Sequence, residues 1–272
     1  MISDPEELAV TLLAQLIERR IGLHYAVRDR PILAGKLRDH ADAEGFDSLL
    51  DFYRSVEYDD LGGERLNTLV DVLIVGETYF LRERPGLERV VEIVQERRSR
   101  HLSTRIWSAA CATGEEILSL AAMLAEQNLL EDVRLVASDV SDRQLARARK
   151  GHHTLRSLRL LPDGMPPWIR AQDGVAVVDP RLTQRVDWRK VNLIDSAAVA
   201  ALGPFDVILC RNVLIYFDDA MVVRVAETLA DALVPGGTLL IGTSESLLRF
   251  ATSLRCVESR GTFLYRRHEN AR

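Results

Sequence analysis

Residues 105–116 read RIWSAACATGEE, and a Leu- and Ala-rich run follows them to Ala125. The apolar pair Ile106-Trp107 indicates a short strand, and the small residues that lead to Gly114 indicate a tight turn. The turn opens a helix whose first turn carries two carboxylates. A strand, a turn of small residues and a helix in this order are typical of a nucleotide-type binding site in an α/β fold.

The residues of this turn restrict the ligand that it can hold. Small side chains let a ligand approach the backbone, and the free N–H groups at a helix start favour negative charge. Glu115 and Glu116 would repel a phosphate there, and the Lys-Ser/Thr pair of a P-loop is absent. The pattern favours a ligand with hydroxyl groups and a cationic centre, such as S-adenosylmethionine. The alternative is a helix start whose glutamates only complement the helix dipole.

A second landmark follows at Asp139. The run Arg134-Leu135-Val136-Ala137-Ser138-Asp139 predicts the next strand, and residues 143–150 predict the helix after it. In doubly wound folds a carboxylate at the end of the second strand commonly binds ribose hydroxyls, about 20 residues after the turn. Asp139 lies 24 residues after Glu115, which fits that role. The alternative is that Asp139 only caps a helix.

Composition sets the broad class of the protein. The 272 residues are 47% hydrophobic and 28% charged, with a net charge of −5 and a pI near 5.8. These values predict a soluble globular protein with one large and one small domain. No apolar run reaches the roughly 18 residues of a membrane span. The first residues are acidic where a signal peptide is basic, so we expect a cytoplasmic protein without membrane insertion.

Cysteine and histidine give no ligand pattern. Cys111, Cys210 and Cys256 lie far apart without a C-x-x-C spacing, which favours small, partly buried residues over a disulfide framework or a zinc site. The adjacent His152 and His153 would not face the same way on a regular element. We therefore expect no metal site.

Residues 1–75 predict a small bundle of four helices. Apolar stripes at helical spacing mark each of them: Leu8, Leu12, Leu16 and Ile17; Ile32, Leu33 and Leu37 after Pro31; Phe46, Leu49, Leu50 and Tyr53; Leu66, Leu69, Val70, Leu73 and Ile74 after Gly62-Gly63.

The segment Arg19–Arg38 has six basic residues and one acidic residue, a local surplus of five positive charges. It is either a solvated face or a docking surface for an acidic partner. Nucleic acid is disfavoured, because the domain has no basic overall charge and no aromatic residues alternate with the arginines.

The rest of the chain divides at about residue 99. We interpret residues 76–98 as a linker that contributes to the site, with Gly76–Arg82 at the domain junction, and residues 99–272 as the α/β domain. Between 151 and 185 Pro and Gly interrupt the strand-helix rhythm around Val175–Val178, which predicts a small antiparallel insertion.

The rhythm resumes with strands near 186–193 and at 205–210, a helix at 220–233, and strands at 238–242 and 262–267. Polar residues 211–218 follow the apolar strand 205–210, and open α/β sheets bind ligands at such carboxyl ends.

Five blocks in this order resemble the chemotaxis-receptor glutamate methyltransferases of the CheR type. They are Glu77-Thr78-Tyr79-Phe80-Leu81-Arg82; Trp107–Glu116; Ala137-Ser138-Asp139; Asn192-Leu193; and Cys210–Phe217, with Ser244-Glu245-Ser246 downstream. The resemblance covers essentially the whole chain. It implies a doubly wound, mostly parallel methyltransferase sheet with a small β insertion, preceded by a small all-α N-terminal domain for receptor recognition.

The family resemblance also implies the reaction and its residues. S-adenosylmethionine would methylate glutamate side chains in the cytoplasmic helices of chemoreceptors and leave S-adenosylhomocysteine, an adaptation step of chemotaxis. The cofactor site would be lined by Thr78, Arg82, Glu115, Asp139, Asn192, Leu193, Arg211 and Asn212. Arg82 and Tyr216 would lie beside the transferred methyl as catalytic residues, and the basic segment Arg19–Arg38 resembles the family's receptor-facing helix.

A glutamate substrate needs no general base. With an unperturbed pKa of about 4.3 it is already an anion at neutral pH. Arg82 would hold it by a charge-assisted hydrogen bond, and Tyr216 would align it with a weaker bond.

The sequence departs from the family at Gly76, where some members have Asn, and at Leu81, which replaces the second Phe of Phe-Phe-Arg.

Two other functions compete with this interpretation. One is a binding module that retains the cofactor but signals through protein contacts, which Arg82 and Tyr216 disfavour. The other is a small-molecule methyltransferase, which the basic helical domain disfavours.

Overall fold

The computed structural model describes residues 4–161 and 166–269. The chain forms two compact units: Met1–Val75 with Tyr216–Met221, and Gly76–Ile215 with Val222–Arg272. Among the described residues no helix is both long and apolar enough to cross a membrane.

The first unit contains the four predicted helices. They are α1 (Pro5–Ile21), α2 (Arg30–Ala43), α3 (Leu49–Arg54) and α4 (Glu64–Leu73). Helix α1 begins where the Asp4 carboxylate accepts the Glu6 N–H at 3.1 Å, and it ends at Gly22, whose φ of 80° only glycine adopts readily. Its buried stripe contains Leu16 and Ile17 as predicted. Leu8, predicted to belong to that stripe, is instead 47% exposed, and its neighbour Ala9 is buried.

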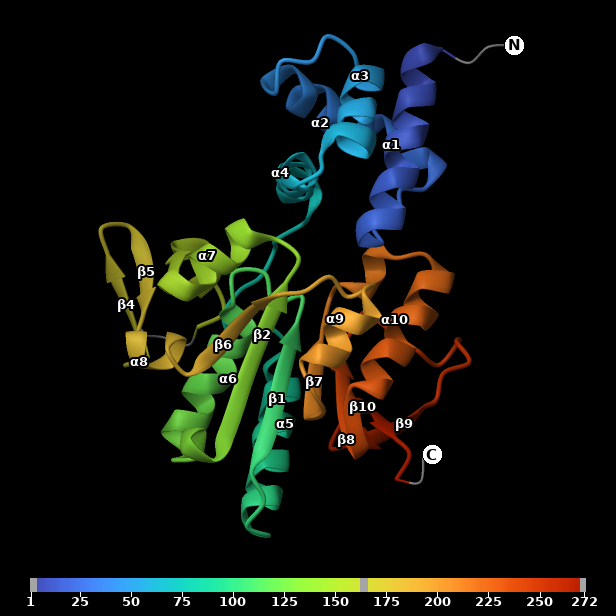
Figure 1. Cartoon of the computed structure of the whole chain (residues 1–272). Helices are drawn as coiled ribbons and strands as arrows, with labels where there is room; N and C mark the ends of the chain where they lie inside the picture. The colour runs from blue at the N-terminus through green and yellow to red at the C-terminus, as the bar shows by residue number, and fades with distance from the viewer. Residues whose placement is uncertain (1–3, 162–165, 270–272) are drawn as a thin grey trace. The chain divides into compact units, whose positions relative to one another are not determined.

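A seven-stranded sheet forms the centre of the second unit (Figure 1). Its strands are β1 (Thr104–Ala109), β2 (Val133–Asp139), β6 (Val186–Lys190), β7 (Phe205–Cys210), β8 (Leu233–Ile241), β9 (Leu254–Ser259) and β10 (Thr262–Arg267). The order is β6-β2-β1-β7-β8-β10-β9. The five strands from β6 to β8 are parallel, and β10 and β9 are antiparallel. This confirms the predicted doubly wound, mostly parallel sheet.

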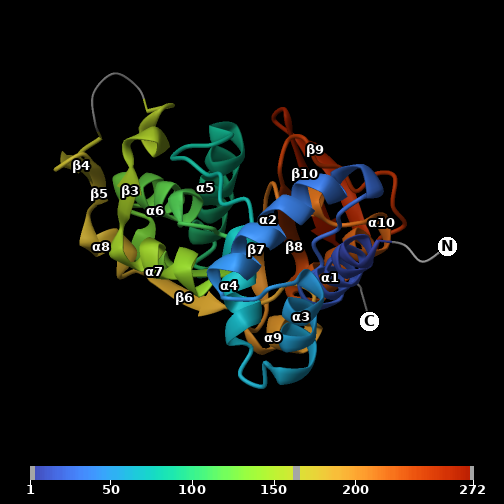
Figure 2. The ribbon, with the colours of Figure 1, turned by 90° about the horizontal axis from the view of Figure 1, so that it is seen from above.

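Helices cover both faces of this sheet. They are α5 (Arg84–Arg98), α6 (Glu115–Glu126), α7 (Asp142–Lys150), α9 (Ser196–Ala201) and α10 (Asp219–Asp231). Figure 2 shows α5 and α6 on one side of the strands and α9 on the other. Apolar residues of α5, α6 and one sheet face share a single buried cluster, which includes Leu87, Leu118 and Ile106. Trp107, one position later in β1, points to the opposite face and packs against Phe205.

The segment 76–98, predicted to be a linker, contains α5 and is largely structural. Phe80 is fully buried and lies edge-on to His153 and Trp168, with ring centroids 4.9 and 5.5 Å away. Pro85 occupies the first turn of α5, where its missing N–H costs nothing. Thus residues 80–94 contribute to the core of the second unit.

The predicted antiparallel insertion is present. It consists of β3 (His152–Thr154), β4 (Ile169–Gln172) and β5 (Val175–Val178) in the order β3-β5-β4, followed by the short helix α8 (Pro180–Thr183). Ala176 and Val178 are buried against α6 and α8, so one face of this small sheet extends the main core.

Candidate active site

The turn between β1 and α6 has a strained backbone. Ala110, Ala112 and Gly114 all have positive φ, at 56°, 47° and 89°. Such conformations cost of order 1 to 3 kcal/mol for a residue other than glycine and persist where the surroundings enforce them. A Cβ on Gly114 would lie 2.7 Å from the Trp188 ring, so only glycine fits. The turn is therefore held in one shape, with its small side chains beside the ends of β1 and β2.

Asp139 fixes this turn from the end of β2. Its Oδ2 accepts the Ala112 N–H at 2.8 Å, its Oδ1 accepts the Ser141 N–H at 2.9 Å, and its backbone oxygen accepts the Val191 N–H at 3.0 Å. The alternative that Asp139 only caps a helix is wrong, because the hydroxyl of Ser141 caps α7 through the Gln144 N–H.

Asn192 and Leu193 directly follow the strand that pairs with β2. The Val191 bond to Asp139 brings them beside that residue, and the Asn192 Oδ1 accepts the Ile194 N–H at 3.3 Å. Leu193 is buried. Three of the predicted site residues therefore lie together at the carboxyl ends of β2 and β6.

Arg211, after β7, is the centre of a buried ion cluster. Only 2% of its side chain is exposed. It donates to Glu116 at 2.9 Å, to Glu83 at 3.0 Å and to the backbone oxygen of Arg82 at 2.7 Å. The chain order reverses between β1 and β7, and an open α/β sheet binds its ligand at this reversal. Arg211 thus joins α6, β7 and the start of α5 at that point.

Asn212 continues the same network. It has a φ of 59°, its N–H donates to the Glu245 Oε2 at 2.7 Å, and its side-chain amide donates to Glu83 at 3.3 Å. Glu83, Glu116 and Glu245 were not predicted as site residues. The adjacent Glu115-Glu116 pair was the available signal for Glu116, which accepts from the Ser108 hydroxyl at 2.7 Å and so faces β1.

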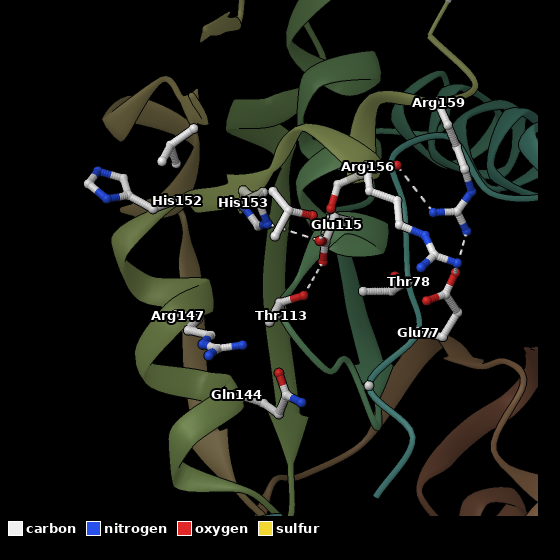
Figure 3. Close-up of a pocket in the computed structure, with 14 residues that line it drawn as sticks. Glu77, Thr78, Thr113, Glu115, Gln144, Arg147, His152, His153, Arg156 and Arg159 are labelled. Atoms are coloured by element: carbon white, nitrogen blue, oxygen red, sulfur yellow. Dashed lines mark hydrogen bonds and ion pairs between the residues drawn. The ribbon is translucent and has the colours of Figure 1, made fainter. Parts of the chain in front are cut away.

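Glu115 points the other way, into a pocket of about 440 Å³ that it lines together with Thr78 (Figure 3). Its carboxylate accepts hydrogen bonds from Ser157 at 2.9 Å and Thr113 at 2.6 Å, and lies 3.0 Å from the His153 Nδ1. Only 3% of its side chain is exposed. Glu115 and Thr78 therefore share the lining of this pocket, and Asp139 and Arg211 are not part of that lining.

Two carboxyls of this region have a lowered pKa. Burial alone would raise the pKa of Glu115, but His153 and the Thr113 hydroxyl more than offset it. Burial also acts to raise the pKa of Glu83, but the Arg211 guanidinium outweighs burial and lowers that pKa. A depressed folded-state pKa contributes stability above the unfolded value, and that stability is lost as pH falls through the folded pKa.

We therefore expect the free energy of unfolding to decline as pH drops below about 4.5, the ordinary value of these groups. Urea unfolding at a series of pH values measures this decline. Glu115→Gln should lower stability at neutral pH and flatten the acid limb. Glu131→Gln, which changes a largely exposed carboxylate, is the control. An acid limb as steep in Glu115→Gln as in the wild type would contradict the assignment.

Arg82 and Tyr216 lie in different compact units of the chain. The Arg82 guanidinium donates to the Glu77 backbone oxygen at 3.0 Å and lies 5.6 Å from the centre of the Tyr79 ring. Within residues 4–161 and 166–269 it has no carboxylate partner. Tyr216 ends a 3-10 helix (Leu214–Tyr216), and its backbone oxygen accepts the His24 N–H at 2.9 Å. Their joint action on a substrate stays a prediction.

The polar groups at the strand ends are suited to bind S-adenosylmethionine. Asp139, Asn192 and Glu116 offer oxygen acceptors to hydroxyl and cationic groups, whereas the Arg211 charge is already neutralised by two glutamates. Cys111 and Cys210 border this region, and burial raises the pKa of both thiols well above the usual value. Both therefore stay neutral thiols. They are buried where the sequence predicted partly buried residues, whereas Cys256 is partly buried as predicted. The groups are therefore suited to bind a cationic nucleoside rather than a phosphate.

The family model and the relatives that match this chain all indicate the same protein family. Residues 76–263 match the family model described as CheR methyltransferase, SAM binding domain. The chain is 36% identical over 237 residues to chemotaxis protein methyltransferase 2 of Vibrio cholerae, covering 84% of this chain and 80% of the relative. It is 30% identical over 269 residues to chemotaxis protein methyltransferase 1 of Pseudomonas aeruginosa, covering 94% and 96%. It is also 30% identical over 260 residues to the chemotaxis protein methyltransferase of Salmonella typhimurium, covering 93% and 88%.

Proposed function

Because the chain belongs to the CheR methyltransferase family, we propose that it transfers a methyl group from S-adenosylmethionine to glutamate side chains of chemoreceptors. The products are glutamate methyl esters and S-adenosylhomocysteine, and the reaction takes place in the cytoplasm, on the receptors' cytoplasmic helices. The observation that carries the proposal is the set of oxygen acceptors at the ends of β1, β2 and β6 within the matched residues 76–263.

Each site residue contacts a particular part of the cofactor. Asp139 accepts from the ribose hydroxyls, and Asn192 and Leu193 border the nucleoside beside it. Glu116 faces the amino or sulfonium end, with Arg211 and Asn212 fixing its surroundings. Arg82 and Thr78 approach from the segment before α5. Glu115 acts through Thr113, whose hydroxyl it holds at 2.6 Å, and so positions the turn.

The chemistry is a displacement between a carboxylate and a methyl group. The cofactor supplies an electrophilic methyl on a positively charged sulfur. The substrate carboxylate is an anion at neutral pH, so the protein has no proton to remove and needs no base. Arg82, which has no carboxylate partner among the described residues, orients the carboxylate, and Tyr216 aligns it. Too tight a grip by Arg82 would weaken the nucleophile.

The test is transfer of labelled methyl to membranes that contain the matched chemoreceptors, followed by mild alkali. Methanol released by alkali identifies carboxyl methyl esters and supports the proposal. Binding of S-adenosylhomocysteine without any transfer would favour a binding module instead. Transfer to a free metabolite but to no protein would favour a small-molecule methyltransferase.

We further propose that the segment Arg19–Arg38 contacts the receptor. The local surplus of positive charge is smaller than the sequence alone indicates, because Arg19 and Arg20 lie 2.7 and 3.6 Å from Glu57, and Arg38 lies 2.6 Å from Glu6. Arg28 is 87% exposed, and Val27 and Ile32 are exposed apolar neighbours. Exposed apolar and basic side chains in one segment suit contact with an amphipathic acidic helix.

The double substitution Arg28→Glu with Lys36→Glu is therefore expected to slow receptor methylation about tenfold at low salt, because reversed charges slow encounter with an acidic surface. The deficit should appear in KM and shrink as salt rises. Affinity for S-adenosylhomocysteine, measured by calorimetry, should not change. Arg54→Glu, an exposed arginine of α3, serves as the matched control. Equal loss in both variants would place the docking surface elsewhere.

A further inference from the structure

A single carboxylate, that of Glu245, holds the backbone that follows β7. Its Oε2 accepts the N–H groups of Asn212 and Gly242, each at 2.7 Å. Its Oε1 accepts the Leu214 N–H at 2.8 Å. Hydrogen bonds to a charged acceptor are roughly twice as strong as those between neutral groups. Three such bonds therefore tie the segment after β7 to Gly242, the residue that follows β8.

The backbone that Glu245 holds has a shape that needs support. Asn212 has a φ of 59°, in the left-handed region that residues other than glycine rarely adopt. Leu214 begins the 3-10 helix that ends at Tyr216, and the first N–H groups of a helix have no partner within it. Unfavourable conformations persist where the surroundings enforce them. Glu245 supplies an enforcing contact at both Asn212 and Leu214.

A second carboxylate reaches the same corner from the residue before α5. The Glu83 Oε2 accepts the Thr243 N–H at 2.9 Å, and its Oε1 accepts the Asn212 side-chain amide at 3.3 Å. A Cβ on Gly242 would lie 2.6 Å from the Asn212 Nδ2 and 2.8 Å from the Glu245 Oε2, so only glycine allows this approach. Asn212 is therefore fixed by its backbone and by its side chain.

The two carboxylates differ in one respect that matters for a test. Glu83 forms an ion pair with the buried Arg211, so replacing Glu83 would also leave a cation without one of its partners. Glu245 forms no ion pair with an arginine or lysine in the part of the chain that the structure describes. Replacing Glu245 therefore changes the support of the backbone without disturbing a buried cation.

We propose that Glu245 is a positioning residue of the cofactor site. It touches neither cofactor nor substrate, and it acts by keeping Asn212 and Leu214 in the conformation that presents the Asn212 side chain to the site. Its loss loosens residues 211–214, which weakens cofactor binding and slows methyl transfer. This role rests on the proposed assignment of Asn212 to the cofactor, although binding of S-adenosylhomocysteine can be measured without any methyl acceptor.

The test is calorimetric titration of the full chain with S-adenosylhomocysteine. Glu245→Gln keeps the length of the side chain, but its amide nitrogen would face at least one of the three N–H donors. We expect the affinity to fall about tenfold, because a bond to a charged acceptor is lost. Glu227→Gln is the matched control: the Glu227 carboxylate accepts the N–H and hydroxyl of Ser253 at 2.6 and 2.8 Å, away from the site, so its affinity should not change.

A second variant displaces the same contacts without removing a charge. The methyl group of Gly242→Ala would press against the Asn212 amide and the Glu245 carboxylate, so the affinity should again fall about tenfold. Gly62→Ala is its control, because a Cβ there would meet only the Glu64 side chain, at 3.8 Å. Its affinity should equal that of the wild type.

Urea unfolding of each variant separates positioning from a purely structural role. A purely structural residue would lower the free energy of unfolding and leave the affinity of the folded protein unchanged, and that result for Glu245→Gln and Gly242→Ala would overturn the proposal. An equal loss of affinity in Glu227→Gln would also overturn it. Loss of affinity in these two variants alone supports the assignment even where no methyl transfer is detected, so its failure and that of the proposed reaction are distinguishable.

Discussion

Replacing Arg82 with alanine is expected to reduce methyl transfer to the receptor at least about a hundredfold, because the substrate carboxylate loses the group that orients it. In the described part of the chain this guanidinium contacts a backbone oxygen and the Tyr79 ring and forms no ion pair. Single-turnover transfer of labelled methyl, beside calorimetric affinity for S-adenosylhomocysteine, measures the effect. Affinity should fall much less than the rate.

Two further variants sharpen this test. Arg84→Ala removes a neighbouring exposed arginine that pairs with Glu88 at 2.8 Å, and its transfer rate should stay near that of the wild type. Arg82→Lys keeps the charge but loses the planar fork, so an intermediate rate is expected. If Arg82→Ala lowered cofactor affinity by the same factor as the rate, Arg82 would belong to cofactor binding alone. An unchanged rate would remove it from the site.

The sequence was informative where short-range patterns determine structure. The apolar run 134–139 predicted that Asp139 ends a strand, and the apolar run of β7 predicted that Arg211 follows one, which the structure confirms. Asn192 came from the family resemblance. The helix α5 was not predicted, because residues 76–98 were interpreted as a linker although Leu87, Val90, Val91 and Val94 have helical spacing after Pro85. Proline in the first turn is a helix start, and that was the signal.

The direction of single side chains and the ion pairs between distant residues could not be predicted from local sequence patterns. Successive residues of a helix point about 100° apart, so the sequence could not decide whether Glu115 or Glu116 faces β1. In the structure Glu116 does, and Glu115 faces the insertion. The pairing of Arg211 with Glu83 joins residues that are 128 positions apart, and no local pattern encodes it.

Replacing Arg211 with methionine is expected to lower the free energy of unfolding by about 3 kcal/mol or more, because removal of one partner of a buried ion pair leaves the other charge uncompensated. Here two carboxylates, Glu83 and Glu116, lose their common partner, and the Arg82 backbone oxygen loses a donor. Urea unfolding at neutral pH measures the loss. Arg189→Met, which breaks an exposed pair with Asp187 at 2.8 Å, should cost less than about 1 kcal/mol.

The pH dependence separates an electrostatic cause from a packing cause. The Arg211 guanidinium lowers the pKa of Glu83 against the effect of burial, so that pKa must rise when the cation is removed. Wild-type stability falls as pH drops below about 4.5, whereas the variant no longer holds that charge and falls less. The deficit of Arg211→Met should therefore be largest near neutral pH and shrink in acid. A deficit that stays constant over this range would show that Arg211 acts through its packed volume, and the network that joins β7, α6 and α5 would then not be an ionic one.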